Sequence, residues 1–255
     1  MHYKKLGPFI AHAIEHEKVC YTSRELRKSL FHSKRAISLW ISSLFMIGSF
    51  FFAFASFFSL WFVALFSSLS IGILYFTGSI FFTSAAYLQY LESINYDISH
   101  LPHLYHRHPI WFWWRWRPLN MGYLSSSTQF VGTLLFNLST FVAIFSTLSI
   151  ETLNLLVWIP NILGSILFLT SSFFGYLEIY HDIKIKIFKN ITWWIVWINI
   201  LGSVFFMISA LYSAYTLEIN QFSIYIATLT TLLGAICFFI AALLLRFEKV
   251  FNRTA

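Results

Sequence analysis

Residues 36–91 read AISLWISSLFMIGSFFFAFASFFSLWFVALFSSLSIGILYFTGSIFFTSAAYLQYL and contain no Lys, Arg, Asp or Glu. A helix that crosses a membrane needs about 20 mostly apolar residues. The 56 residues of this run are too many for one such helix and fit two. The sequence therefore predicts a pair of membrane-spanning helices joined by a tight turn near residues 61–68.

Two further pairs of apolar runs follow along the chain. Residues 123–148 and 155–179 form one pair, separated by a polar stretch at 149–154. Residues 191–217 and 222–245 form the other, separated at 218–221. Together the runs predict an all-α membrane protein with six transmembrane helices.

The composition excludes several other classes of protein. The 255 residues are 58% hydrophobic and only 11% charged, whereas soluble domains are about 25% charged. A net charge of +7 is carried by too few residues for a nucleic-acid-binding domain. Two cysteines, Cys20 and Cys237, cannot form a disulfide framework.

Basic residues give the orientation of the spans. Eight of the 17 Lys and Arg lie in residues 1–35, and the others lie between the helix pairs or at the carboxyl-terminal end. The turns within the pairs contain none, so all 17 fall on one side of the membrane. Because cytoplasmic segments are enriched in Lys and Arg, both termini are predicted to be cytoplasmic. The chain then divides into an arm (1–35), three hairpins (36–92, 123–179 and 191–248), two cytoplasmic loops (93–122 and 180–190) and a tail (249–255).

One pattern of residues recurs in all six predicted spans. Each has a glycine followed by a small residue, a phenylalanine at +4 and small residues at +7 and +8. The second helix of each hairpin also has a glutamate at +14, which makes the hairpin the repeating unit. Parallel repeats are related by an axis along the membrane normal, so we expect pseudo-threefold symmetry. The glycines are Gly48, Gly78, Gly132, Gly164, Gly202 and Gly234, and the glutamates are Glu92, Glu178 and Glu248.

Helix packing explains the pattern physically. Lipid tails leave little hydrophobic drive between helices, so small residues that let backbones approach stabilise the contact. The phenylalanine lies about 40° from the glycine around the helix and could fill the space beside a neighbour's glycine. If the glycines face the bundle, the glutamates share that face at its cytoplasmic end.

Three segments carry a resemblance to a known family: GSIFFTSAAYLQYLE at 78–92, QFVGTLLFN at 129–137 and WWIVWINILGS at 193–203. They resemble bacterial membrane proteins with YrhK-type domains, over roughly residues 40–245. The resemblance implies a multi-pass protein of the bacterial inner membrane. It implies no catalytic residue, since no activity is established for that family.

Polar residues in the spans are candidates for a pathway through the bundle. The three glutamates could form an acidic ring on the axis, as in cation pathways, or could mark helix ends and pair with nearby Lys or Arg. Arg246 and Lys249 flank Glu248 and favour such pairing. Deeper in the spans, Gln129, Asn137 and Asn199 could line a solute site, although bonding between helices is their commoner use.

The predicted loop between the first two hairpins holds two further motifs. Four histidines, His100, His103, His106 and His108, could bind zinc or nickel; the alternative is a polar loop at the membrane interface. The stretch WFWWRWR at 111–117 interleaves Trp and Arg. It is typical of an anchor at the membrane interface rather than of a nucleic-acid site.

Beyond these motifs, the sequence contains no GxSxG, HExxH or glycine-rich phosphate loop, so it favours a non-enzymatic role without a cofactor. The arm at 1–35 fits a basic helix lying on the anionic lipids of the cytoplasmic leaflet, or one that docks a partner protein. The leading hypothesis is passive passage of an ion or small solute along the axis. The alternatives are a scaffold or regulatory protein whose repeats serve packing only, and a metal-dependent membrane enzyme.

Overall fold

The computed structural model describes residues 34–62, 64–99, 112–145, 148–180, 190–214 and 220–251. Every regular element in these ranges is helical. The long helices are α2 (Lys34–Trp61), α3 (Ser68–Ser99), α4 (Met121–Val142), α6 (Ile159–Tyr180), α7 (Ile191–Tyr212) and α8 (Gln221–Phe251). Two short elements, α5 (Ile150–Leu153) and the π-helical turn η1 (Asn154–Trp158), lead directly into α6.

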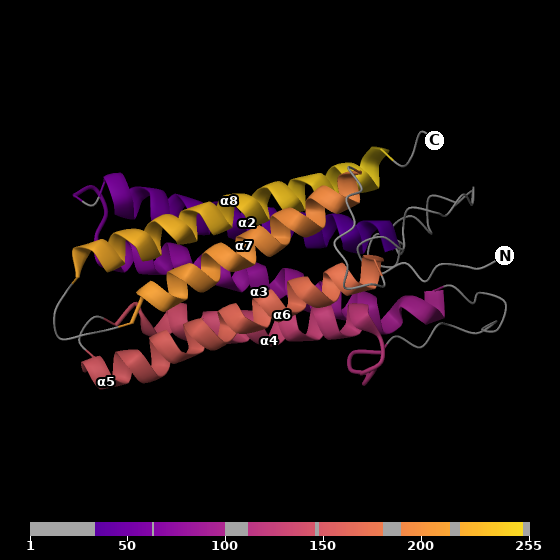
Figure 1. Ribbon diagram of the computed structural model, residues 1–255, viewed down its shortest axis with the longest axis horizontal. Helices are drawn as coiled ribbons and strands as arrows, with labels where there is room; N and C mark the ends of the chain where they lie inside the picture. Colours follow the sequence, from indigo (N-terminus) through magenta and orange to yellow (C-terminus); the bar gives the residue numbers. More distant parts are fainter. Residues whose placement is uncertain are drawn as a thin grey trace, which may run out of the picture.

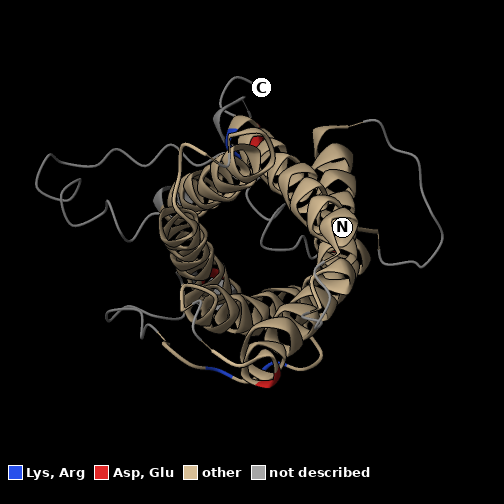
Figure 2. Cartoon of the chain, turned by 90° about the vertical axis from the view of Figure 1, so that its left-hand side faces the viewer, with Lys and Arg blue, Asp and Glu red and all other residues tan. Residues whose placement is uncertain are grey.

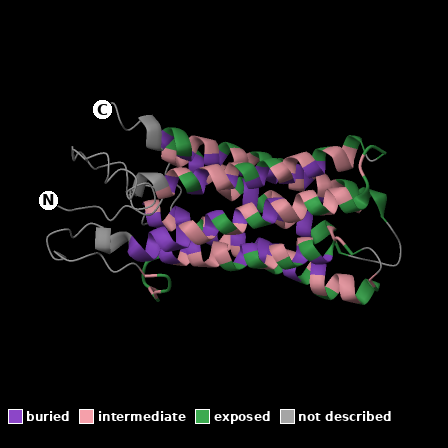
Figure 3. Cartoon of the chain, turned by 180° about the vertical axis from the view of Figure 1, so that it is seen from behind, coloured by how far each residue is buried: buried purple, intermediate pink, exposed green. Residues whose placement is uncertain are grey.

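Five helical segments of the described chain are long and apolar enough to cross a membrane: those in α2, α3, α7 and α8, and the continuous run Ile150–Tyr180. The exception is α4, which has the length of a span but carries the polar run SSSTQ at 125–129. Large apolar side chains such as Phe50, Phe173 and Leu201 are exposed on the outside of the bundle. The fold is thus a helical bundle of the kind that spans membranes, and the exposed positions lie along its outer faces (Figure 3).

The second hairpin differs from the predicted boundaries. Helix α4 ends at Val142 rather than at residue 148, with tightened turns in which the N–H groups of Ile144 and Phe145 bond to the carbonyls of Phe141 and Val142. Residues 149–154, expected as the turn, begin the next helix instead. The reason is a capping hydroxyl: Ser149 Oγ accepts from the Thr152 N–H at 3.3 Å, which satisfies an otherwise free donor of the first turn.

Pro160 consequently lies inside a helix, because the helical run that contains it begins at Ile150. Proline lacks an N–H, and its ring crowds the carbonyl four residues earlier. The π-helical turn η1 comes directly before it, and there the Ile159 N–H bonds to the Asn154 carbonyl across five residues. This widened turn lets the helix continue past the proline.

The six long helices form a closed ring. Each packs against its neighbours along the chain, α6 packs against α4, and α8 closes the ring against α2. Figures 1 and 2 show the arrangement from the side and along the bundle. We call the end with residues 62–67 the turn end, and the end where α2 begins and α8 finishes the terminal end.

Glycines set the distance between the two helices of each hairpin. A Cβ atom added at Gly48 would lie 3.0 Å from the Gly78 carbonyl oxygen, and one added at Gly78 would lie 3.1 Å from the Gly48 oxygen. The same reciprocal approach joins Gly132 to Gly164. In the third hairpin, a Cβ at Gly234 would meet the Gly202 oxygen at 3.1 Å. Glycine is therefore needed where these backbones cross.

Candidate functional site

The phenylalanines at +4 from the glycines all point to the axis of the bundle. Each packs over the glycine of the other helix in its hairpin; the Phe206 ring, for example, would be only 2.5 Å from a Cβ at Gly234. All six side chains are at most 6% exposed. We call this group the phenylalanine plug, and its members are Phe52, Phe82, Phe136, Phe168, Phe206 and Phe238.

The plug has two layers. In the layer nearer the terminal end, the ring centroid of Phe82 lies 6.4 Å from that of Phe168 and 5.9 Å from that of Phe238, and Phe168 and Phe238 are 5.8 Å apart. In the layer nearer the turn end, Phe206 lies 5.7 Å from Phe52 and 5.8 Å from Phe136. Aromatic pairs at such distances and angles are mutually stabilising.

Contacts within each hairpin join the layers. Centroid distances are 5.5 Å for Phe52–Phe82, 5.1 Å for Phe136–Phe168 and 5.4 Å for Phe206–Phe238. The space left among the rings is about 10 Å³, with apolar walls. A water molecule needs about 10–15 Å³ and at least two polar partners, so the centre of the plug is dry.

The two layers follow from the direction of the helices. A +4 position lies about 6 Å further along a helix than its glycine. Because α2, α4 and α7 run toward the turn end while α3, α6 and α8 run back, the same spacing places three rings on each side of the glycine crossing.

A large cavity lies between the plug and the turn end. Its volume is about 730 Å³, and all six long helices contribute to its lining. Three rings of the plug, Phe52, Phe136 and Phe206, face it, and its walls carry hydroxyl and amide side chains. No charged side chain is among its described lining residues. We call it the turn-end cavity.

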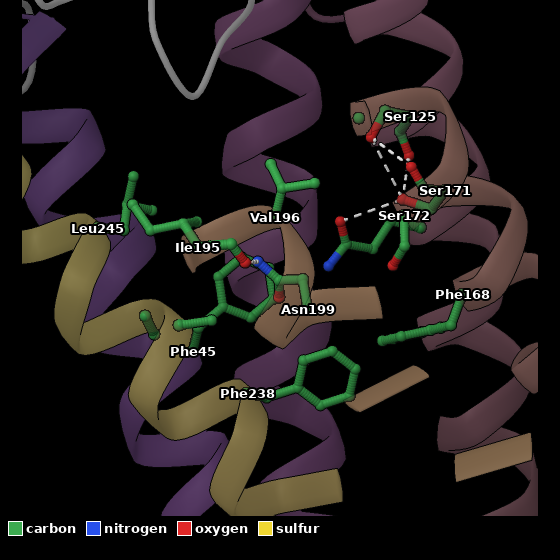
Figure 4. Close-up of a pocket in the computed structure, with 14 residues that line it drawn as sticks. Phe45, Ser125, Phe168, Ser171, Ser172, Ile195, Val196, Asn199, Phe238 and Leu245 are labelled. Atoms are coloured by element: carbon green, nitrogen blue, oxygen red, sulfur yellow. Dashed lines mark hydrogen bonds between the residues drawn. The ribbon is translucent and has the colours of Figure 1, made fainter. Parts of the chain in front are cut away.

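A smaller cavity of about 50 Å³ lies on the other side of the plug, where about three water molecules would fit. Its lining combines Phe45, Phe168 and Phe238 with polar side chains, among them Gln129 and Asn199 (Figure 4). We call it the terminal-end cavity.

Hydroxyl groups cross-link α4 and α6 beside the terminal-end cavity. Ser125 Oγ donates to the Ser171 carbonyl at 2.9 Å, and Ser171 Oγ donates to the Ser125 carbonyl at 2.8 Å. Gln129 Oε1 lies 3.4 Å from Ser171 Oγ. On α7, the Asn199 side chain donates to the Ile195 carbonyl at 3.0 Å. Both amides keep bonding capacity toward the cavity, since each has two N–H donors and an oxygen with two lone pairs.

Asn137, the third polar candidate, lines neither cavity. Its Oδ1 is buried without a hydrogen-bond partner among the described residues. A second such group, Gln89 on α3, was not among the residues predicted from the sequence; it is 1% exposed, and both of its amide atoms are unpartnered within the described chain. Its position at +11 from Gly78 puts it on the helix face of Phe82, a signal that was readable in the sequence.

The three glutamates are buried near the terminal end, at 9%, 8% and 6% exposed for Glu92, Glu178 and Glu248. Glu178 interacts electrostatically with Glu92, whereas Glu248 accepts a hydrogen bond from Thr192 on the other helix of its hairpin. Arg246, which flanks Glu248, donates to Ser43 on α2. None of the three glutamates lines either cavity.

The tryptophan segment is held against the end of α3. The Asn95 side chain donates to the Phe112 carbonyl at 2.8 Å and accepts from the Phe112 N–H at 2.9 Å. The exposed fractions of Trp113, Trp114 and Trp116 are 67%, 70% and 72%. The three indole rings are therefore largely exposed on a fixed piece of backbone, with Trp114 beside Tyr90 and Trp116 beside Tyr123.

Several predicted features lie outside the described residues. These are the four histidines, Trp111, most of the arm at 1–35 and the loop at 181–189. Within the described ranges, no cluster of His, Cys, Asp and Glu could hold a metal ion. Comparison with known families, curated proteins and solved structures finds no match for this chain.

Proposed function

We propose that this protein provides a passive, gated pathway for an ion or small solute along the axis of its membrane bundle. One observation carries the proposal: two cavities whose walls include hydroxyl and amide side chains lie on opposite sides of the dry phenylalanine plug. Placing polar side chains at the depth of the membrane costs free energy unless they form hydrogen bonds with water, a solute or other polar groups. A hydrophobic constriction between wetted spaces is a known gate, because water leaves it spontaneously.

The proposed topology has six spans, arranged as three parallel hairpins about a pseudo-threefold axis. Helix α4 would be the sixth span despite its polar residues, since it lies in the ring between α3 and α6. The distribution of Lys and Arg supports cytoplasmic termini. The turn end would then face outward. The resemblance to YrhK-type proteins supports the bacterial inner membrane.

Glu92, Glu178 and Glu248 are proposed as the cytoplasmic mouth of this pathway. The electrostatic interaction of Glu178 with Glu92 supports an acidic region shared by these two residues, and Glu248 is assigned to it because it has the same position in the repeat. Replacing all three by Gln should reduce cation flux through an opened plug. Unchanged cation flux would remove the acidic mouth from the proposal.

The gate is tested by removing one ring from each layer and measuring flux. Phe206→Ala and Phe238→Ala, singly and combined, are reconstituted into liposomes, and release of K⁺ and of glycerol is followed. Wild-type protein is expected to be nearly closed and the double variant leaky. The matched control is Phe173→Ala, which removes an exposed ring 47% accessible on the outside of α6.

A folded double variant that is no leakier than wild type would overturn the proposal. Size-exclusion chromatography separates this outcome from misfolding. If the double variant does not fold, reporter cysteines at Ser139 and Ser171 in an otherwise cysteine-free protein replace it. Reaction of Ser139→Cys only from outside and of Ser171→Cys only from inside is expected, with Ag⁺ as a thiol reagent small enough to enter the terminal-end cavity of about 50 Å³. Protection of both from either side would also overturn the proposal.

The second candidate is a non-transporting scaffold, and the tightness of the plug favours it. This function predicts no flux even when the plug is opened, together with a partner protein that binds through residues 1–35. A pull-down that is unchanged after deletion of the arm would count against it.

A further inference from the structure

We infer that the turn-end cavity binds uncharged, polyhydroxylated solutes, of which sorbitol is a suitable probe. This inference names the solute class for the proposed pathway and rests on that function. The juxtaposition that carries it is an aromatic floor, walls that include several hydroxyl and amide side chains, and no charged side chain among the described lining residues.

The size of the cavity suits such a ligand. Its volume of about 730 Å³ lies within the range of about 300–1,000 Å³ that small-molecule sites occupy. The terminal-end cavity, at about 50 Å³, has room for about three water molecules and is too small for a polyol.

The floor of the cavity offers an apolar contact surface. Phe52, Phe136 and Phe206 face it from three different hairpins. Linear and cyclic polyols have C–H surfaces between their hydroxyl groups, and these pack against aromatic rings by dispersion.

The walls offer neutral donors and acceptors. Ser209 Oγ donates to Thr231 Oγ1 at 2.7 Å, and Thr231 Oγ1 donates to the Ala227 carbonyl at 2.9 Å, so both hydroxyl oxygens keep lone pairs that can accept from a ligand. Asn161 donates one amide hydrogen to Ser213 Oγ at 3.0 Å, which leaves its other N–H and its carbonyl lone pairs available. Such groups match hydroxyls, which both donate and accept.

An ion is disfavoured at the same place. It would lose hydration in the cavity without gaining an opposite charge from the described walls, and burying an unpaired charge is far costlier than burying a hydroxyl with partners. The site should therefore discriminate sorbitol from salts.

The test measures protection of a cysteine in the cavity. Full-length protein with Cys20→Ser, Cys237→Ala and Ser223→Cys is labelled with a neutral maleimide at increasing sorbitol. Sorbitol is expected to slow the labelling saturably, by about threefold at a concentration of twice its Kd. NaCl at equal osmolality is expected not to slow it. The control reporter Ser67→Cys, exposed on the turn end and outside the cavity lining, should not respond. Adding Ser209→Ala and Thr231→Val should abolish the protection.

Equal slowing by NaCl, or no slowing by sorbitol, would overturn the inference. Labelling needs no passage through the plug, so its failure is distinguishable from failure of the pathway. Protection by sorbitol together with a sealed double plug variant would remove the proposed pathway. If that variant releases K⁺ but sorbitol does not protect the cysteine, the inference about the solute class is refuted and the proposed pathway stands.

Discussion

The middle of the bundle and its terminal-end half are built on the same three hairpins but differ in how tightly they close. In the middle, every hairpin supplies the same residues, a pair of glycines and a pair of phenylalanines, and only about 10 Å³ remains. Toward the terminal end the hairpins differ. At +11 from the glycine the residue is Gln89, Gly175 or Leu245, and at −3 it is Phe45, Gln129 or Asn199.

The terminal-end cavity follows from those differences. It is lined by Gln129 and Asn199 and by Gly175, which has no side chain to fill the space. Gln89, in the equivalent place on α3, is fully buried instead. Where all three hairpins carry the same side chains, the axis is closed. Where their side chains differ, space remains that polar groups line.

The largest expected effect comes from removing a ring of the phenylalanine plug. Phe168→Ala should lower the free energy of unfolding by about 3 kcal/mol, because it removes a buried ring in contact with Phe82, Phe136 and Phe238. The measurement is an SDS titration of the protein in mixed micelles. Phe173→Ala, on the exposed side of the same helix, should change stability by less than about 1 kcal/mol. Equal losses for the two variants would mean that the plug is not the tightest part of the bundle.

A methyl group added in each region sharpens the comparison. A Cβ at Gly234 would meet Phe206 at 2.5 Å, so Gly234→Ala should cost about 2 kcal/mol by overpacking. At Gly175 the nearest atom to such a Cβ is Ser125 Oγ at 3.5 Å. Gly175→Ala should therefore be neutral or about 0.5 kcal/mol stabilising, since alanine favours a helix. Thermal unfolding in one detergent compares the two. A tolerated Gly234→Ala would contradict the close helix crossing.

The smallest effect concerns the buried amide of Gln89. Gln89→Met keeps the volume and removes two unpartnered polar atoms, so a gain of about 1 kcal/mol in the free energy of unfolding is expected. Gln129→Met, which loses the contact with Ser171, should instead cost about 0.6 kcal/mol. The same SDS titration serves for both. A destabilised Gln89→Met would show that this amide has a partner, such as a bound water molecule.

Much of the local structure was determined by the sequence alone. A span must satisfy its backbone hydrogen bonds within itself, so long apolar runs become helices whatever surrounds them, and the turn at residues 61–68 lies where it was expected. The boundaries of the second hairpin were not predicted correctly. They depend on one capping hydroxyl at Ser149 and on the π-helical turn before Pro160, which outweigh the hydropathy of residues 143–154.

The packing of side chains along the axis of the bundle depends on the tertiary structure. The +4 spacing assigns each phenylalanine to its neighbour's glycine, but the convergence of all six depends on closure of the ring by α2 and α8, from opposite ends of the chain. Contacts such as Phe52–Phe206, 5.7 Å between centroids, join hairpins far apart in sequence. A helix forms from local hydrogen bonds, whereas a plug or a cavity exists only where distant side chains meet, and no pattern within one span specifies that meeting.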